Sequence, residues 1–134
     1  MNHWLVKTEP DEYSYQMLQR QGRCAWTGVR NNLALKYLRL MKPDDQVLVY
    51  HTGSEKAVVG LATVVREAYP DPTDAAAKAV AVDLQAAALL AHPVSLQQIK
   101  AAPIFATWEL VRIPRLSVMP VSDLQFKRIL ELAK

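Results

Sequence analysis

Short apolar runs alternate with polar, proline-containing turns in the first part of the chain. The apolar run at residues 4–6 is closed by Glu9-Pro10-Asp11, where proline removes a backbone donor and favours extended geometry before it. This run predicts an edge or opening strand. Ser14 is placed to cap a short helix that continues to about Arg20. A strand followed by a short helix is therefore expected here.

An amphipathic helix is predicted between residues 32 and 41. Its apolar side chains recur at i, i+4, i+7 and i+8, as Leu33, Tyr37, Leu40 and Met41. The opposite face is basic and carries Lys36, Arg39 and Lys42. Such a face is usually a solvated helix surface, and if it binds a phosphate backbone the affinity should fall steeply with salt.

Two apolar runs rich in β-branched residues predict neighbouring strands. Residues 47–50 and 58–65 are separated by the polar segment 52–56, a length compatible with an antiparallel hairpin. Gly60 inside the second run indicates a bulge or a close backbone approach. These runs predict the centre of a sheet.

The segment at residues 75–91 supports two interpretations. Its alanines favour a helix, whereas the alternation of Val80, Val82 and Leu84 with smaller or polar residues favours a strand. We favour a strand that begins at Val80.

Capping boxes predict two helix starts in the last third of the chain, at Ser95 and at Ser122. Residues 112–118 between them are predicted to be extended, with an interruption at Pro114. The final helix is expected to pack Leu124, Phe126, Ile129 and Leu130. The element order predicts a mixed α+β fold with a small, mainly antiparallel sheet.

Length and composition fit one globular domain that spans residues 1–134. Of the 134 residues, 51% are apolar and the net charge is +3, which permits an anionic partner without demanding one. No apolar stretch approaches the roughly 20 residues of a membrane helix, and no signal peptide is recognised. We expect a cytoplasmic protein without a membrane partner.

No catalytic or metal-binding pattern stands out. His3, His51 and His92 are far apart, and no acidic partner lies at metal-ligand spacing. The single cysteine, Cys24, has no local catalytic partner, and the four glycines do not form a phosphate-binding loop. We expect a non-catalytic protein with no metal and no cofactor.

The segment Trp26-Thr27-Gly28-Val29-Arg30-Asn31 holds the strongest candidate chemistry. An aromatic plane, a cation and an amide within six residues are the parts that a base-binding pocket needs. The alternative is that Trp26 belongs to the core and that Asn31 or Asn32 caps the following helix. Local chemistry leaves both interpretations open.

Seven motifs occur in order along the chain: 4–10, 26–31, Tyr50-His51, 59–62, 66–73, 93–96 and 115–121. In these motifs and their order the sequence resembles the EVE domain family of the PUA-like superfamily. It implies a PUA-like pseudobarrel flanked by helices, related to the SRA and YTH domains that take a flipped, modified base into an aromatic-lined pocket.

The resemblance also implies a set of site residues. A base would be held by Thr8, Trp26, Val29, Asn31, Tyr50, His51, Leu116 and Ser117, and phosphates would be contacted by Lys7, Arg30 and Arg115. Arg66, Tyr69 and Asp71 are expected to brace a loop. Two positions depart from the family pattern: Ala79 stands where a Trp is common, and Thr8 stands where Ser is usual.

The leading interpretation is a module that binds nucleic acid, DNA or RNA, and accepts a modified, extruded base. One alternative is an enzyme that acts on a nucleotide or nucleic acid, with His51 as acid or base near Ser117 or Cys24. Another is a module that binds a small metabolite or a protein.

Overall fold

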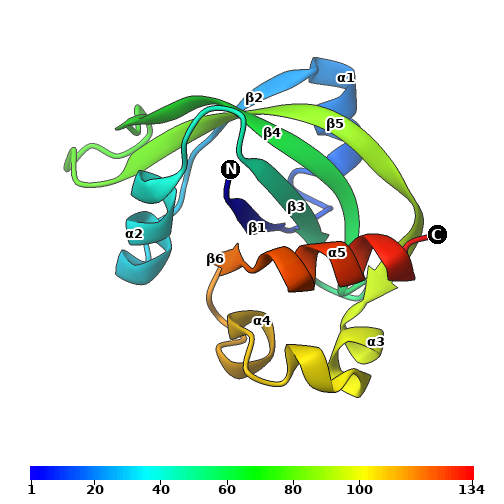
Figure 1. Ribbon diagram of the computed structural model, residues 1–134. Coiled ribbons are helices and arrows are strands. Elements are labelled where there is room, and N and C mark those ends of the chain that lie inside the picture. The colour runs from blue at the N-terminus through cyan, green and yellow to red at the C-terminus, as the bar shows by residue number, and fades with distance from the viewer.

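A strongly curved sheet of six strands forms the centre of the computed structural model, which describes all residues 1–134 (Figure 1). The strands are β1 (His3–Thr8), β2 (Arg23–Trp26), β3 (Gln46–His51), β4 (Ala57–Pro70), β5 (Val80–Ser95) and β6 (Val118–Val121). The helices are α1 (Tyr15–Gln21), α2 (Asn32–Leu40), α3 (Leu96–Ala101), α4 (Glu109–Arg112) and α5 (Asp123–Leu132), with a short 3-10 helix at Pro103–Phe105.

The strand order is β2-β5-β4-β3-β1-β6, and the sheet does not close because β2 and β6 do not pair. Only β1 and β3 run parallel, so the prediction of a mixed α+β fold with a mainly antiparallel sheet is confirmed. Figure 1 shows α3 and α4 at the end of the molecule opposite α1. No helix is both long enough and apolar enough to cross a membrane.

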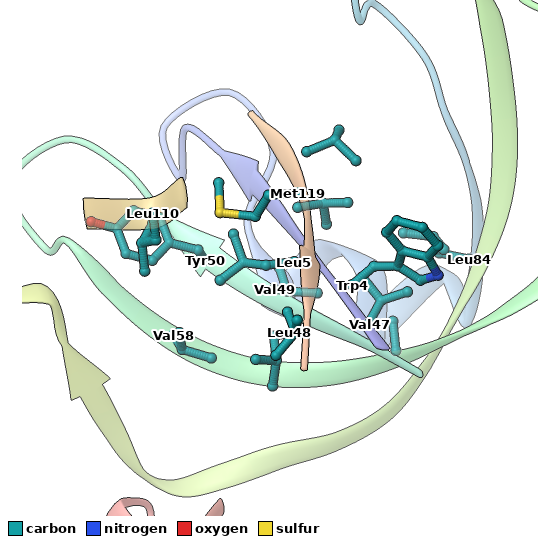
Figure 2. Close-up of a cluster of buried hydrophobic side chains, with 14 of the residues drawn as sticks. Trp4, Leu5, Val47, Leu48, Val49, Tyr50, Val58, Leu84, Leu110 and Met119 are labelled. Carbon is teal, nitrogen blue, oxygen red and sulfur yellow. The ribbon is translucent and has the colours of Figure 1, made fainter. Parts of the chain in front are cut away.

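β1 is the opening strand, but the prediction of an edge position was wrong. It lies between β3 and β6, and its central residues Leu5 and Val6 have no exposed surface. The side chains of β1 and β3 form a buried cluster with Met119 of β6 (Figure 2). A strand with both faces buried reads as a continuous apolar run, which is why the sequence pattern did not distinguish an edge from the centre.

The hairpin of β3 and β4 and the strand from Val80 are confirmed. β5 pairs with β2 on one side and β4 on the other, so strand pairing outweighs the helix preference of its alanines. The bulge expected at Gly60 is confirmed, whereas the close approach is made by a side chain and not by backbone. The β4–β5 register shifts between Val58 and Gly60, and a Cβ at Gly60 would lie 2.5 Å from the Tyr15 ring.

Both predicted capping boxes are present, at Ser95 of α3 and Ser122 of α5. The extended segment predicted at 112–118 was wrong. Arg112 ends α4, the next residues form a turn in which the N–H of Leu116 donates to the carbonyl of Ile113, and only Val118 begins a strand. Pro114 prevents the regular pairing that an extended segment would need.

The final helix packs on the core through Phe126 and Ile129, while Leu130 is partly buried. The expectation for Leu124 was wrong, because this side chain is 67% exposed. Leu124 lies in the first turn of α5, on the face turned away from the core.

Candidate nucleic-acid interface

A cavity of about 400 Å³ lies where the end of β1 meets the end of β2. We call it the Trp26 cavity. Its walls come from β1, the turn before α1, β2 with the loop after it, and the residue before β6: Lys7, Thr8, Glu9, Glu12, Tyr13, Cys24, Ala25, Trp26, Thr27, Gly28, Val29, Arg30 and Ser117. The structure therefore brings together six of the predicted site residues: Lys7, Thr8, Trp26, Val29, Arg30 and Ser117.

The aromatic part of the wall is a pair, Trp26 and Tyr13. Their rings meet edge to face, with centroids 5.9 Å apart and an angle of 82° between the planes. Trp26 is 7% exposed, and its indole N–H donates to no protein group. The Tyr13 hydroxyl donates to Oε1 of Gln21, and burial together with the Cys24 thiol raises the pKa of Tyr13. Tyr13 was not predicted as a site residue, because its sequence position indicated only a packing role beside the α1 cap.

Hydrogen-bonding groups enter the cavity from two strands that are distant in sequence. The Thr8 hydroxyl donates to the carbonyl of Tyr13 at 2.6 Å, which fixes the turn before α1 and leaves the hydroxyl oxygen as an acceptor. The backbone N–H of Lys7 donates to the carbonyl of Ser117 at 2.9 Å. This bond holds Ser117 beside β1. The hydroxyl of Ser117 forms no hydrogen bond within the protein.

The loop that forms the far wall is braced by Asp71, a residue with 3% exposure. Its carboxylate accepts the backbone N–H of Gly28 at 2.9 Å, Nη1 of Arg30 at 3.1 Å, and both the N–H and the hydroxyl of Thr73 at 2.7 Å. Gly28 has φ +83°, a left-handed conformation that suits glycine. Asp71 thus fixes the loop, as expected, and does not line the cavity.

The hydrogen bonds to Asp71 also decide its charge. Burial by itself raises the pKa of this carboxyl group, but the bonds from Thr73, Gly28 and Arg30 outweigh burial and lower the pKa to about 2. Asp71 is therefore ionised at neutral pH and attracts the guanidinium of Arg30, whose side chain is 47% exposed.

The lining carries charges of both signs. Lys7 and Arg30 supply cations, whereas Glu9 and Glu12 supply carboxylates that sequence reasoning did not identify. Oε2 of Glu9 accepts a bond from the Thr52 hydroxyl at 3.0 Å, while the Glu12 carboxylate has no protein donor. Glu9 and Glu12 flank Pro10, and that signal indicated a turn rather than a binding wall.

Three residues expected in the site lie outside the cavity. Oδ1 of Asn31 accepts the N–H of Ala34 at 3.0 Å and caps α2, because the first turn of a helix has unpaired N–H groups. Leu116 is 2% exposed and belongs to the core. Arg115 is exposed on the turn after α4 and lines no cavity.

His51 is buried away from the Trp26 cavity, at 3% exposure. Its Nε2 accepts the backbone N–H of Tyr15 at 2.9 Å, so the ring proton lies on Nδ1, which is 2.8 Å from Oε1 of Glu55. Both ring nitrogens are therefore engaged, and the ring is not beside Ser117 or Cys24, as the enzyme alternative requires. No group of three or more His, Cys, Asp or Glu side chains is arranged to hold a metal ion.

Tyr50, the neighbour of His51 in β3, also lies outside the Trp26 cavity. It lines a second cavity, which shares only Lys7 with the first. Tyr50 and Trp26, both expected to hold the base, thus line two different cavities.

Ala79 is buried at the start of β5, where its backbone rather than its side chain is used. Its N–H donates to Asp74 and its carbonyl accepts the N–H of Asp71. A shallow cavity of about 350 Å³ adjoins Ala79, and Arg30 lines both this cavity and the Trp26 cavity. Ala79 thus lines the shallow cavity and not the Trp26 cavity.

Comparisons with known proteins agree with this architecture. The chain matches the EVE domain family model over residues 2–132. It is 31% identical to thymocyte nuclear protein 1 of Rattus norvegicus over 98% of this chain and 73% of the rat protein. Its fold matches an NMR structure of a Rhodopseudomonas palustris protein with a TM-score of 0.93 and 41% identity, covering 99% of this chain and 93% of the other.

A third match concerns a structure with nucleic acid. The human THYN1 protein, solved in complex with DNA that contains 5-methylcytosine, superimposes with a TM-score of 0.91 and 27% identity, covering 100% of this chain and 98% of the human one. The family match spans nearly the whole sequence, and the fold agrees with it over the same length. The chain therefore belongs to the EVE domain family.

Proposed function

We propose that this chain is a non-catalytic nucleic-acid-binding domain that accepts one modified, extruded base in the Trp26 cavity. The observation that carries the proposal is the cavity itself. Its volume of about 400 Å³ lies within the range of about 300–1,000 Å³ that is usual for ligand pockets, and it joins an aromatic pair to free polar groups. The human relative in complex with 5-methylcytosine DNA supports the choice of ligand.

In this proposal the groups of the cavity have separate tasks. Trp26 stacks on the base or closes one side of the cavity, with Val29 as apolar wall. Ser117 and Thr8 bond the edge of the base, and the free carboxylate of Glu12 accepts an exocyclic amino group such as that of cytosine. Lys7 and Arg30 contact the phosphates beside the extruded nucleotide.

The contacts of His51 support the non-catalytic part of the proposal. A general acid or base needs to be within reach of the reacting group, but both nitrogens of this ring bind protein groups outside the cavity. Of the residues that line the cavity, none is a histidine.

The test is a titration of matched oligonucleotides, in DNA and in RNA form, that differ only in one 5-methylcytosine. The wild type should bind the modified strand more tightly. Trp26→Leu keeps apolar bulk but removes stacking worth about 1–3 kcal/mol per base, so its Kd should rise roughly 5- to 150-fold. Trp26→Phe keeps an aromatic face and should lose less affinity.

A milder variant separates binding from folding. Ser117→Ala removes one hydroxyl that has no protein partner, so the fold should be unaffected and the preference for the modified base should fall. Thr107→Ala, an exposed hydroxyl outside every cavity, is the matched control. Equal affinity for all oligonucleotides in the wild type and in Trp26→Leu would overturn the proposal.

A further inference from the structure

A second cavity of about 290 Å³ lies between the β3–β4 turn, α3 and α4. We call it the Tyr50 cavity. Lys7 is the one residue that it shares with the Trp26 cavity, and Nζ of Lys7 donates to the carbonyl of Pro114, which lines the Tyr50 cavity alone. Lys7 therefore lines both cavities and makes one hydrogen bond on the Tyr50 side.

The charged lining of the Tyr50 cavity is entirely positive. Lys7, Lys56 and Lys100 contribute ammonium groups from three different elements, and no Asp or Glu lines the cavity. None of the three lysines takes part in an ion pair within the protein. Lys7 uses one of its three donors on Pro114 and has two left.

Glu9 and Glu55 are the carboxylates nearest in sequence to Lys7 and Lys56, and both already have hydrogen-bond partners. Glu9 accepts the Thr52 hydroxyl at 3.0 Å, and Glu55 lies 2.8 Å from Nδ1 of His51. Glu9 adjoins Gly53, and Glu55 lines a neighbouring cavity together with Lys56 and Lys100, but neither carboxylate lines the Tyr50 cavity itself.

Tyr50 supplies an unpartnered polar group. Tyr50 is 3% exposed, yet its hydroxyl forms no hydrogen bond within the protein. Figure 2 shows this hydroxyl beside Leu110, pointing away from the cluster around Leu5 and Val49. The hydroxyl oxygen is not fully covered by protein and can therefore reach a ligand in the cavity, and burial raises the pKa of Tyr50, which keeps the hydroxyl a donor.

We propose that the Tyr50 cavity binds the phosphate group of a nucleotide. Three cations match a phosphate monoester, whose charge is about −1.5 to −2 at neutral pH, better than a singly charged carboxylate. The Tyr50 hydroxyl donates to a phosphate oxygen, and the apolar walls of Leu96, Leu110 and Val111 contact the attached sugar or base. The site is separate from the base-binding function of the Trp26 cavity.

Calorimetric titration with adenosine 5′-monophosphate, and with adenosine as the phosphate-free control, tests the proposal. The wild type should bind the monophosphate and bind adenosine at least about 10-fold more weakly. Tyr50→Phe removes only the hydroxyl and should weaken monophosphate binding about 10-fold. Lys56→Gln combined with Lys100→Gln should have at least the same effect, whereas Lys36→Gln combined with Lys127→Gln, outside both cavities, should have none.

A second pair of titrations identifies the source of the phosphate. An oligonucleotide with a 5′-phosphate is compared with the same strand lacking it, and a Tyr50-dependent difference would assign the cavity to a nucleic-acid end as well as to free nucleotides. Trp26→Leu should leave monophosphate binding unchanged. A failure of the base-binding proposal can therefore be told apart from a failure of the phosphate proposal. Monophosphate binding that is absent, equal to adenosine, unchanged in Tyr50→Phe or lost in Trp26→Leu would overturn the assignment.

Discussion

Asp71 determines the shape of the Trp26 cavity without touching it. Its carboxylate lies 2.9 Å from the N–H of Gly28, a residue 43 positions earlier in the chain. Four hydrogen bonds satisfy a carboxylate that is otherwise buried, and a buried charge without such partners would be strongly unfavourable. One side chain thereby holds the loop, the orientation of Arg30 and the turn at Thr73.

The lowered pKa of Asp71 predicts a pH-dependent stability. Because its pKa falls from the ordinary 3.8 to about 2 on folding, ionised Asp71 stabilises the native state above pH 4, and this stabilisation is lost as the pH falls through 2. The pH-dependent part corresponds to about 2 kcal/mol. The free energies of unfolding of the wild type and of Asp71→Asn, measured with urea, should therefore differ most above about pH 5. The difference between them should shrink between about pH 4 and pH 2.

Asp11→Asn is the control for this measurement, because Asp11 is exposed and its side chain accepts no hydrogen bond. Its unfolding free energy should follow that of the wild type at every pH. A difference between wild type and Asp71→Asn that stays constant from pH 7 to pH 2 would contradict the role given to the ionised carboxylate.

The tightest packing around any glycine of the molecule joins β4 to α1, where the Tyr15 ring lies against Gly60. Tyr15 is 1% exposed, its hydroxyl donates to the carbonyl of Leu61 at 2.6 Å, and its backbone N–H is bound to His51. The ring therefore cannot move aside from Gly60. This contact orients α1, and with it the turn that carries Tyr13 into the Trp26 cavity.

Gly60→Ala should accordingly destabilise the protein. The added Cβ would lie 2.5 Å from the Tyr15 ring, and overpacking of this kind costs about 1–3 kcal/mol. Chemical denaturation of the single variants Gly60→Ala and Tyr15→Leu, and of the double variant, measures the coupling. Gly60→Ala should lower the free energy of unfolding by less in the Tyr15→Leu background than in the wild type. An equal loss in both backgrounds would show that the Tyr15 ring does not clash with the added Cβ.

For the whole molecule, the distribution of charge predicts how nucleic-acid binding depends on salt. The basic face of α2 is partly occupied, since Lys42 pairs with Glu67 at 3.1 Å and Arg39 donates to the carbonyl of Lys78. The cations at the Trp26 cavity are Lys7 and Arg30. We therefore expect phosphate contacts to be few and centred on that cavity.

Two phosphate contacts correspond to a slope of about −2 in a plot of log K against log salt for duplex DNA. Binding that also used Lys36, Arg39 and Lys42 would give a slope of roughly −4 to −5. Titrations between 50 and 200 mM salt, a range of about fourfold, distinguish the two. Lys36→Gln should leave the affinity and the slope unchanged. A marked loss of affinity in this variant would show that α2 contacts the phosphates.

Local patterns in the sequence were sufficient for most elements. The alternation from Val80 and the capping boxes at Ser95 and Ser122 depend on neighbours within a few residues, and the structure confirms them. The helix α2 is confirmed too, but its predicted apolar face was wrong in part, because Ala34, Leu35 and Leu38 are the buried helix residues and Leu40 is 50% exposed. The turn at Pro114 was missed, because a short helix and a turn leave a weaker periodic signal than a long element.

Membership of the cavities was decided by tertiary structure. Tyr50 and His51 are adjacent in the sequence, yet successive side chains of a strand point to opposite faces, so one reaches the Tyr50 cavity and the other binds Tyr15. Family motifs identified Thr8, Trp26, Val29 and Ser117, whereas Glu12 and Tyr13 enter the same wall only through the path of the turn. Most elements and the family could be predicted from the sequence, because they depend on the local order of residues. Which side chains share a cavity was decided by contacts between β1, β2 and the residue before β6, which lie far apart along the chain.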